Sequence, residues 1–208
     1  MNAGPTSARV YQVLRDLLLR GEIRPGTYLD PVALASELAA STTPVREALC
    51  RLTGEELLET RPGAGFMLPL LDELRLQDLY AWTGDIMTLT LRSARPRQIP
   101  LTPGKAVTAQ SRGFHEGVDY ADASARLFAD IAASSSNSEH AAAMARANAQ
   151  LHAVRMLEPD VLTDAREELH ALTVTACAGP AEAFRREFTR YLRRRRRNTA
   201  ELLRRRYR

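Results

Sequence analysis

Cysteine, lysine and long apolar runs are scarce in this sequence, and each scarcity excludes a class of protein. The 208 residues include two cysteines, Cys50 and Cys177, which lie far apart with no second thiol nearby. Neither a disulfide framework nor a zinc ribbon is therefore indicated, and we expect both to be small core residues. The longest uncharged stretches fall well short of the roughly 18–20 residues of a membrane span, and the first nine residues lack the apolar core of a signal peptide. These features predict a globular cytoplasmic protein that does not associate with membranes.

Positive charge is concentrated at one end of the chain and comes almost entirely from arginine. The formal net charge is +4, and Lys105 is the single lysine among 29 basic residues. Residues 1–68 hold seven Arg against eight Asp and Glu, a net of −1, whereas residues 185–208 hold twelve Arg against two Glu, a net of +10. Five arginines are consecutive, from Arg193 to Arg197. We expect this charge to be relieved by acidic residues of neighbouring helices, by solvent or by DNA phosphate.

The first 68 residues carry local signals for a compact domain of helices and short strands. The predicted elements are helices over 6–20, over 32–39 and from 44 onward, an extended stretch over 23–29, and a hairpin with strands at 57–60 and 65–68. Gly21 ends the first helix and Asp30 caps the second. Pro44 opens the third helix, with Thr43 as its cap and Glu47 close to the fourth place of a capping box. This order is typical of a winged helix-turn-helix, whose third helix can enter a major groove.

The rest of the chain is predicted to be helical. Helices are expected near 72–92, 120–135, 139–157, 160–177 and 180–206. The segment 95–117 holds three prolines and three glycines and is expected to be a loop. We therefore predict a mostly α protein, with an N-terminal winged helix-turn-helix and small β-hairpin over 1–70 and a C-terminal all-α helical bundle over 71–208.

Several sequence motifs within residues 8–68 resemble the DNA-binding domain of the GntR family of bacterial transcriptional regulators. The most specific motif is TPVREAL at 43–49, and IRPGTYL at 23–29 and RPGAGF at 61–66 accompany it. The helical remainder resembles the effector-binding and dimerisation domain of the FadR-type subgroup. The resemblance implies a sequence-specific regulator, expected to be a repressor, that binds a palindromic double-stranded DNA operator as a homodimer.

Candidate DNA-binding residues lie on the third helix and on the wing. Thr42, Thr43 and Arg46 occupy the helix face opposite the apolar positions, and the resemblance implies that Arg46 contacts the operator. At the wing tip, Gly63 is expected to approach the minor groove because it has no side chain, and Arg61 is expected to contact phosphate. The family commonly has Arg where this chain has Thr42, so the operator is expected to differ from the common half-site.

The resemblance also implies where an effector would bind. Many FadR-type domains hold a divalent metal with one Asp and three His, and that metal binds a carboxylate together with a nearby Arg. The corresponding ligand positions here are Ser124, Phe128, Leu169 and Tyr191, which are poor metal ligands. Where the subgroup carries an Arg and a Glu, this chain has Thr83 and Met87, and Trp82 precedes Thr83. We therefore expect no metal and no cofactor, and any pocket is expected to take a small neutral or amphipathic effector.

Three functions stay open on the sequence alone. The first is a regulator that an effector releases from its operator, and the second is a DNA-binding protein whose helical domain only dimerises. The third is a helical enzyme or metal-dependent hydrolase. Because no Gly-rich phosphate loop, serine nucleophile elbow or His-Glu metal motif occurs, an enzyme is not indicated. Ligand-dependent release from DNA separates the first two.

Overall fold

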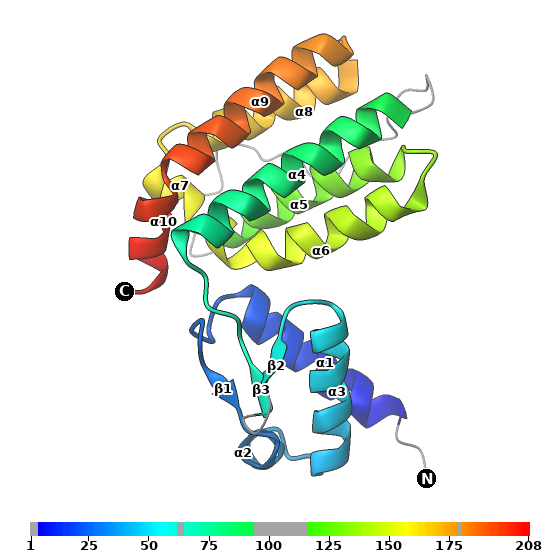
Figure 1. Cartoon of the computed structure of the whole chain (residues 1–208), viewed down its shortest axis with the longest axis vertical. Helices are drawn as coiled ribbons and strands as arrows, with labels where there is room; N and C mark the ends of the chain where they lie inside the picture. Colours follow the sequence, from blue (N-terminus) through cyan, green and yellow to red (C-terminus); the bar gives the residue numbers. More distant parts are fainter. Residues whose placement is uncertain (1–3, 62–64, 94–115, 179) are drawn as a thin grey trace. The chain divides into compact units, whose positions relative to one another are not determined.

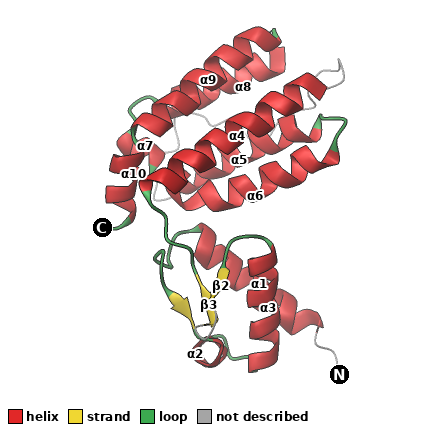
Figure 2. Cartoon of the chain, viewed as in Figure 1, coloured by secondary structure: helices red, strands yellow, loops and turns green. Residues whose placement is uncertain are grey.

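The computed structural model describes residues 4–61, 65–93, 116–178 and 180–208, and it divides the chain into two compact units. The N-terminal unit covers Met1–Leu71 and the helical unit covers Asp72–Arg208. Helices dominate both units, and one small sheet lies in the first (Figure 2). The predicted fold class, mostly α with a small β element, is therefore confirmed.

The N-terminal unit packs three helices with a three-stranded antiparallel sheet. Its elements are α1 (Gly4–Leu19), β1 (Tyr28–Leu29), α2 (Pro31–Glu37), α3 (Thr42–Gly54), β2 (Glu59–Arg61) and β3 (Gly65–Met67). The strand order is β1-β3-β2, with Leu29 and Thr60 both opposite Phe66. The predicted hairpin is thus extended by the stretch that precedes α2, and together they form the sheet beside the helices (Figure 1).

The core of this unit lies between α1 and α3. Val10 and Leu14 of α1 are buried, as are Val45, Leu49 and Leu52 of α3. These residues recur at three- and four-residue spacing, so each helix presents one apolar face to the other. The apolar periodicity of the sequence therefore determines which face of α3 remains exposed.

Two helix starts illustrate what local sequence can predict. Asp30 caps α2 as expected, accepting hydrogen bonds from the backbone nitrogens of Val32 at 3.1 Å and Ala33 at 3.3 Å. The expected Thr43 cap of α3 is wrong, because α3 begins at Thr42 and Ser41 occupies the cap position without a side-chain hydrogen bond. Pro44 lies inside the first turn, where its missing N–H costs nothing.

The helical unit consists of long helices packed side by side. Its elements are α4 (Glu73–Ser93), α5 (Glu116–Ala133), α6 (Ser138–Arg155), α7 (Glu158–Val161), α8 (Ala165–Ala178), α9 (Ala181–Arg197) and α10 (Thr199–Arg206). The central helix α4 contacts α5, α6 and α9 (Figure 1). A bundle of this kind buries residues from several helices in one core.

Several boundaries differ from the sequence prediction. The helix expected over 160–177 is divided into α7 and α8 near Asp164, whose φ of 64° does not continue a right-handed helix. The helix expected over 180–206 ends at Asn198, whose side-chain nitrogen donates to the carbonyl of Arg194 at 2.8 Å. Helix α5 begins at Glu116, and most of the loop expected over 95–117 lies outside the described residues.

The cysteines also differ from expectation, because Cys50 and Cys177 are both exposed. Cys50 follows the buried Leu49, and one residue of an α-helix rotates the side chain by about 100° around the axis. Small size alone therefore did not indicate burial at these positions.

Candidate DNA-binding surface and the core of the helical unit

The exposed face of α3 carries the polar residues that the sequence analysis identified. Thr42, Thr43 and Arg46 are all exposed, while Val45 and Leu49 on the opposite face are buried. Cys50 lies one turn beyond Arg46 on the exposed side. A helix that anchors one face in the core and presents hydroxyls and a guanidinium on the other has the form required for reading a major groove.

Two arginines of α3 have different surroundings. The Cζ of Arg51 lies 3.7 Å from the centre of the Tyr11 ring, and its Nε lies 3.2 Å from Oε1 of Glu55. Arg46, in contrast, has no ion pair within 4 Å among the described residues. Burial and the hydrogen bond to Glu55 raise the pKa of Tyr11, so its hydroxyl stays protonated and donates to that carboxylate. Arg51 therefore has a structural role, whereas Arg46 is available for a ligand.

Of the two DNA-binding residues predicted on the wing, Arg61 lies within the described residues. Arg61 is exposed at the end of β2, and its Nε lies 3.2 Å from Oε1 of Glu59. A phosphate bound by Arg61 would therefore compete with this half-buried carboxylate. Gly63 lies outside the described residues. Gly65, with a φ of 78°, begins β3 in a conformation that favours glycine.

Six of the seven predicted effector-pocket residues are buried in the helical unit. These are Thr83, Met87, Ser124, Phe128, Leu169 and Tyr191, each no more than 2% exposed. The Phe128 ring meets the Tyr191 ring edge-on, with centroids 5.5 Å apart. Trp82, the seventh, is 48% exposed on α4 and is not part of this buried group.

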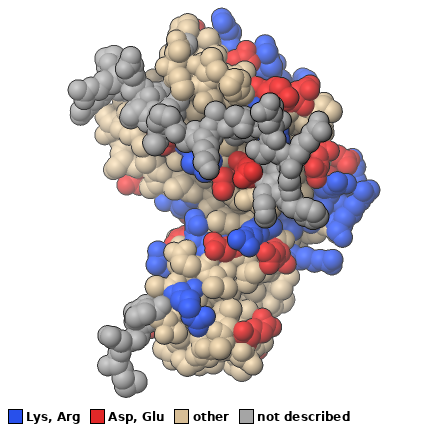
Figure 3. Space-filling model, turned by 180° about the vertical axis from the view of Figure 1, so that it is seen from behind, with Lys and Arg blue, Asp and Glu red and all other residues tan. Residues whose placement is uncertain are grey.

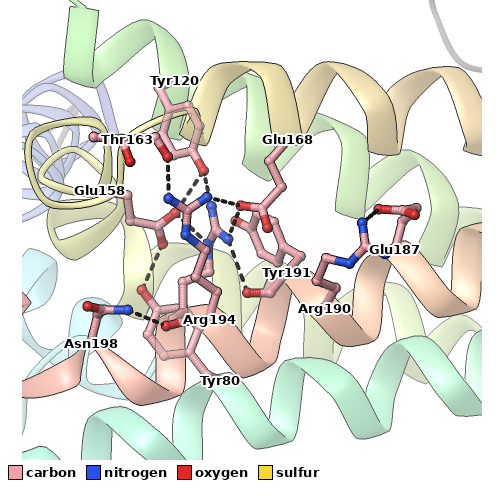
Figure 4. Close-up of polar contacts among 11 residues, drawn as sticks. Tyr80, Tyr120, Glu158, Thr163, Glu168, Glu187, Arg190, Tyr191, Arg194 and Asn198 are labelled. Carbon is pink, nitrogen blue, oxygen red and sulfur yellow. Dashed lines mark hydrogen bonds and ion pairs between the residues drawn. The ribbon is translucent and has the colours of Figure 1, made fainter.

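A cluster of buried charges and hydroxyls lies next to these residues (Figure 4). The hydroxyls of Tyr80 and Tyr120 donate to the two carboxylate oxygens of Glu158, at 2.7 and 2.8 Å. Nε of Arg195 donates to the same carboxylate at 2.8 Å, and its guanidinium also contacts Glu168. The cluster therefore joins α4, α5, α7, α8 and α9.

The cluster holds its groups in fixed protonation states. Burial raises the pKa of Tyr80 and of Tyr120 well above the usual tyrosine value, and the nearby Glu158 carboxylate raises both further. Burial opposes the charge of Arg195, but the carboxylates of Glu158 and Glu168 outweigh this effect and raise its pKa. The tyrosines thus remain hydrogen-bond donors and Arg195 remains a cation at neutral pH.

Arg155 of α6 is a buried cation that the sequence analysis missed. Its side chain is 1% exposed, and its Nη1 donates to Oδ1 of Asn148 at 2.7 Å. Its Cζ lies 5.1 Å from the centre of the Phe128 ring. Among the described residues, no carboxylate lies within 4 Å of this guanidinium, and its Nε has no hydrogen-bond partner. Helical phase, with Leu151 and Val154 on the buried side, was the only sequence signal for this position.

The described residues contain no group of three or more His, Cys, Asp or Glu side chains that could hold a metal ion. Across the described part of the chain, no helix is long and apolar enough to cross a membrane. Basic side chains gather at one edge of the helical unit (Figure 3), and the last turn of α10 carries Arg204, Arg205 and Arg206.

The N-terminal unit is similar in sequence to known transcriptional regulators. Residues 6–68 match the family described as "Bacterial regulatory proteins, gntR family". The Nta operon transcriptional regulator of Aminobacter aminovorans is 47% identical over 57 residues, which are 27% of each chain. The HTH-type transcriptional regulator McbR of Escherichia coli (strain K12) is 36% identical over 66 residues, covering 32% of this chain and 30% of the relative. The chain thus matches less than a third of the length of these two relatives.

Solved structures resemble the chain over nearly its whole length. A putative GntR transcriptional regulator from Rhodococcus sp. RHA1 has a TM-score of 0.69 at 18% identity, covering 95% of this chain and 97% of that one. The E. coli McbR/YncC structure has a TM-score of 0.59 at 19% identity, covering 96% and 97%. At such identities the likeness shows the fold alone. The sequence match to the gntR family is confined to residues 6–68. The chain therefore resembles GntR-family regulators in sequence over residues 6–68 and in fold over nearly its whole length.

Proposed function

We propose that this protein is a sequence-specific DNA-binding transcriptional regulator that acts in the cytoplasm. The observation that carries the proposal is the division of α3 into a buried face, with Val45 and Leu49, and an exposed face with Thr42, Thr43 and Arg46. This division occurs within the residues that match the gntR family. Hydroxyls and a guanidinium can hydrogen-bond to base edges and phosphates, so α3 is the element proposed to enter the major groove.

The regulator is proposed to act as a homodimer of the FadR-type subgroup on a palindromic operator. Two winged units of a dimer read two half-sites about one helical turn apart, roughly 34–36 Å. Because residues 1–68 carry a net charge of −1, phosphate neutralisation by this unit contributes little affinity, and direct contacts from α3 are needed. Repression is the expected sign of regulation, because a dimer bound over a promoter obstructs transcription.

Selection of operator DNA tests this function. Purified protein is mixed with sheared genomic DNA of the source organism, and the captured fragments are sequenced. The proposal predicts a shared motif with two inverted half-sites, spaced by about one turn of B-DNA. Capture of fragments without a shared motif, with the protein shown to be folded, would contradict sequence-specific binding.

Control by a small-molecule effector is a second proposal, and Arg155 favours it. Among the side chains that the structure describes, the guanidinium of Arg155 has no carboxylate partner. Burying such a charge is costly, and an anionic ligand would relieve that cost. The segment 94–115, which lies outside the described residues, contains no Asp or Glu in its sequence. The lost ligand positions alone favour a neutral or amphipathic effector, whereas Arg155 favours a small anion beside Phe128 and Tyr191.

Paired acids and esters test this second proposal. Small carboxylic acids are compared with their neutral methyl esters for their effect on the melting temperature and on operator release. The acids are expected to act on the natural protein and to lose their effect in Arg155→Met, which replaces the buried charge by an apolar chain of similar size. Equal effects of acids and esters would contradict an anionic effector. No effect of either would favour the alternative in which the helical unit only dimerises.

A further inference from the structure

Helix α4 presents a second apolar stripe on the side that faces away from its core. Leu74, Trp82 and Leu89 are 68%, 48% and 45% exposed. Asp78 and Asp85 are also exposed and lie between them, so the five residues follow one another at steps of four, four, three and four. This spacing places all five on one face of the helix. A row of exposed large apolar side chains on one face is typical of a protein-binding surface.

A groove between α4 and α9 runs beside this stripe. It has a volume of about 560 Å³, and its lining residues are Gln77, Ala81, Gly84, Asp85, Thr88, Phe188, Thr189, Leu192, Arg193, Arg196 and Arg197. The two helices approach closely at Gly84. A Cβ added there would lie only 2.8 Å from Cδ1 of Leu192. The stripe and the groove together combine apolar and charged groups. We call this surface the α4–α9 face, and it comprises Leu74, Asp78, Trp82, Asp85, Leu89, Arg193, Arg196 and Arg197.

The charges on the α4–α9 face form no ion pair with one another or with other side chains that the structure describes. Asp85 and the three arginines line the same groove, yet among the described residues no ion pair within 4 Å joins them. Asp78 has no such pair in this part of the chain either. Two carboxylates and three guanidinium groups therefore remain available to a partner with the complementary arrangement.

We propose that the α4–α9 face is the surface through which a second copy of this chain docks. This inference rests on the proposed dimeric regulator and identifies the surface that forms the dimer. In a two-fold contact the same patch meets itself, so a patch with both signs of charge can complement its own copy. Asp78 and Asp85 of one copy face the groove arginines of the other, and the apolar stripe is buried between them.

A nucleic acid fits this face less well than a second copy. The arginines alone would attract phosphate, but Asp78 and Asp85 would repel it. A contact with another apolar surface would remove Trp82 and Leu89 from water, whereas a contact with a phosphate backbone would bury little of their apolar area. The mixture of carboxylates and large apolar groups therefore favours a protein partner, and the presence of both charge signs favours this chain itself.

Charge reversal tests the surface. Variant A carries Asp78→Arg and Asp85→Arg, and variant B carries Arg193→Asp, Arg196→Asp and Arg197→Asp. Light scattering should give about twice 23.1 kDa for the natural protein and about 23.1 kDa for A or B alone, because like charges then face each other. An equimolar mixture of A and B restores opposite charges across the contact, so it should return to the doubled mass.

Matched controls separate this surface from general effects on folding. Trp82→Ser should raise the dimer dissociation constant about tenfold or more, whereas Val174→Ser, at a 51% exposed position on α8, should not change it. Asp119→Arg, at an exposed position on α5, is the control for charge reversal. Circular dichroism verifies that every variant is folded.

Each contrary result has a distinct meaning. If A, B and Trp82→Ser all remain dimers, the α4–α9 face is not the contact, although the proposed dimer still holds. A natural protein that is monomeric with and without operator would overturn both the face and the dimeric function. If B remains a dimer and only its operator affinity becomes less dependent on salt, the arginines contact DNA and the proposed face is wrong.

Discussion

Glu158 of α7 and Arg195 of α9 form an ion pair of 2.8 Å, and neither side chain is exposed to solvent. Burying two charges is costly, and the cost is offset only when their remaining hydrogen-bonding groups are satisfied. Here Tyr80 and Tyr120 donate to the carboxylate, and the guanidinium lies 3.3 Å from the centre of the Tyr191 ring. The pair therefore fixes the relative positions of the helices that enclose the candidate effector site.

Removing one member of this pair should destabilise the helical unit strongly. Arg195→Met leaves the Glu158 carboxylate buried without a cation, and we expect a loss of about 3–5 kcal/mol in the free energy of unfolding. Urea unfolding followed by circular dichroism measures it. Arg186→Met, at an exposed position of the same helix, is the control and should change stability by less than about 0.5 kcal/mol. Equal stability of the two variants would mean that the pair has no structural role.

The buried tyrosines predict a loss of stability in alkaline solution. In the folded state the pKa values of Tyr80, Tyr120 and Tyr191 are raised, and burial is the largest cause. Below the usual tyrosine pKa of about 10, both states keep these protons and stability is unaffected. Above it the unfolded state releases protons that the folded state retains, so each tyrosine lowers stability by about 1.4 kcal/mol per pH unit.

Urea unfolding at several values of pH measures this slope. Tyr80→Phe removes one of these groups, so its slope above a pH of about 10 should be smaller by about 1.4 kcal/mol per pH unit. A free energy of unfolding that stays constant through this range, or a variant with an unchanged slope, would show that these hydroxyls are not held protonated by the fold.

Two glycines provide a matched test of close packing. A Cβ at Gly117 of α5 would lie 2.3 Å from the carbonyl oxygen of Met156, whereas a Cβ at Gly54 would meet no atom within 4 Å. Gly117→Ala should therefore lower stability by about 1–3 kcal/mol, because backbone must move. Gly54→Ala should be neutral or stabilising by up to about 1 kcal/mol, because alanine favours the helix. Thermal unfolding of the two variants compares them, and the opposite ranking would contradict the packing of α5 against Met156.

Metal content is expected to be negligible. The resemblance to the FadR-type subgroup implies that its metal-binding positions correspond to Ser124, Phe128, Leu169 and Tyr191, and none of these supplies an imidazole or carboxylate. Elemental analysis should find no stoichiometric zinc, nickel or manganese, and chelators should leave the melting temperature unchanged. About one metal per chain would overturn this correspondence, and the exposed His170 beside Leu169 would then be the first ligand to test.

Local signals predicted the N-terminal unit better than the helical unit. Asp30 caps α2 through contacts two and three residues away, so the residue types alone indicate that start. The burial of Arg195 depends on Glu158 and Glu168, which lie on other helices, so the consecutive arginines gave no local sign of which one is buried. Arg155 is similar, because an arginine in a helix is usually exposed and only tertiary packing encloses it.

The candidate sites show the same difference. The exposed face of α3 follows from the spacing of Val45, Leu49 and Leu52, which defines the opposite face. The exposed stripe of α4 was not predicted, because Trp82 appeared in sequence to belong with its buried neighbour Thr83. Adjacent residues on a helix lie about 100° apart, so one can be buried while the next is exposed.

The affinity of the Arg46→Ala variant for the selected operator tests the central claim most directly. This substitution removes an exposed guanidinium from α3 and leaves its buried face intact, and Arg20→Ala removes the same charge at an exposed position beyond the end of α1. Fluorescence anisotropy at fixed salt should show binding weakened by about 1–3 kcal/mol for Arg46→Ala and little change for Arg20→Ala. Equal affinities of the natural protein and a folded Arg46→Ala variant would contradict the proposal that α3 reads the operator.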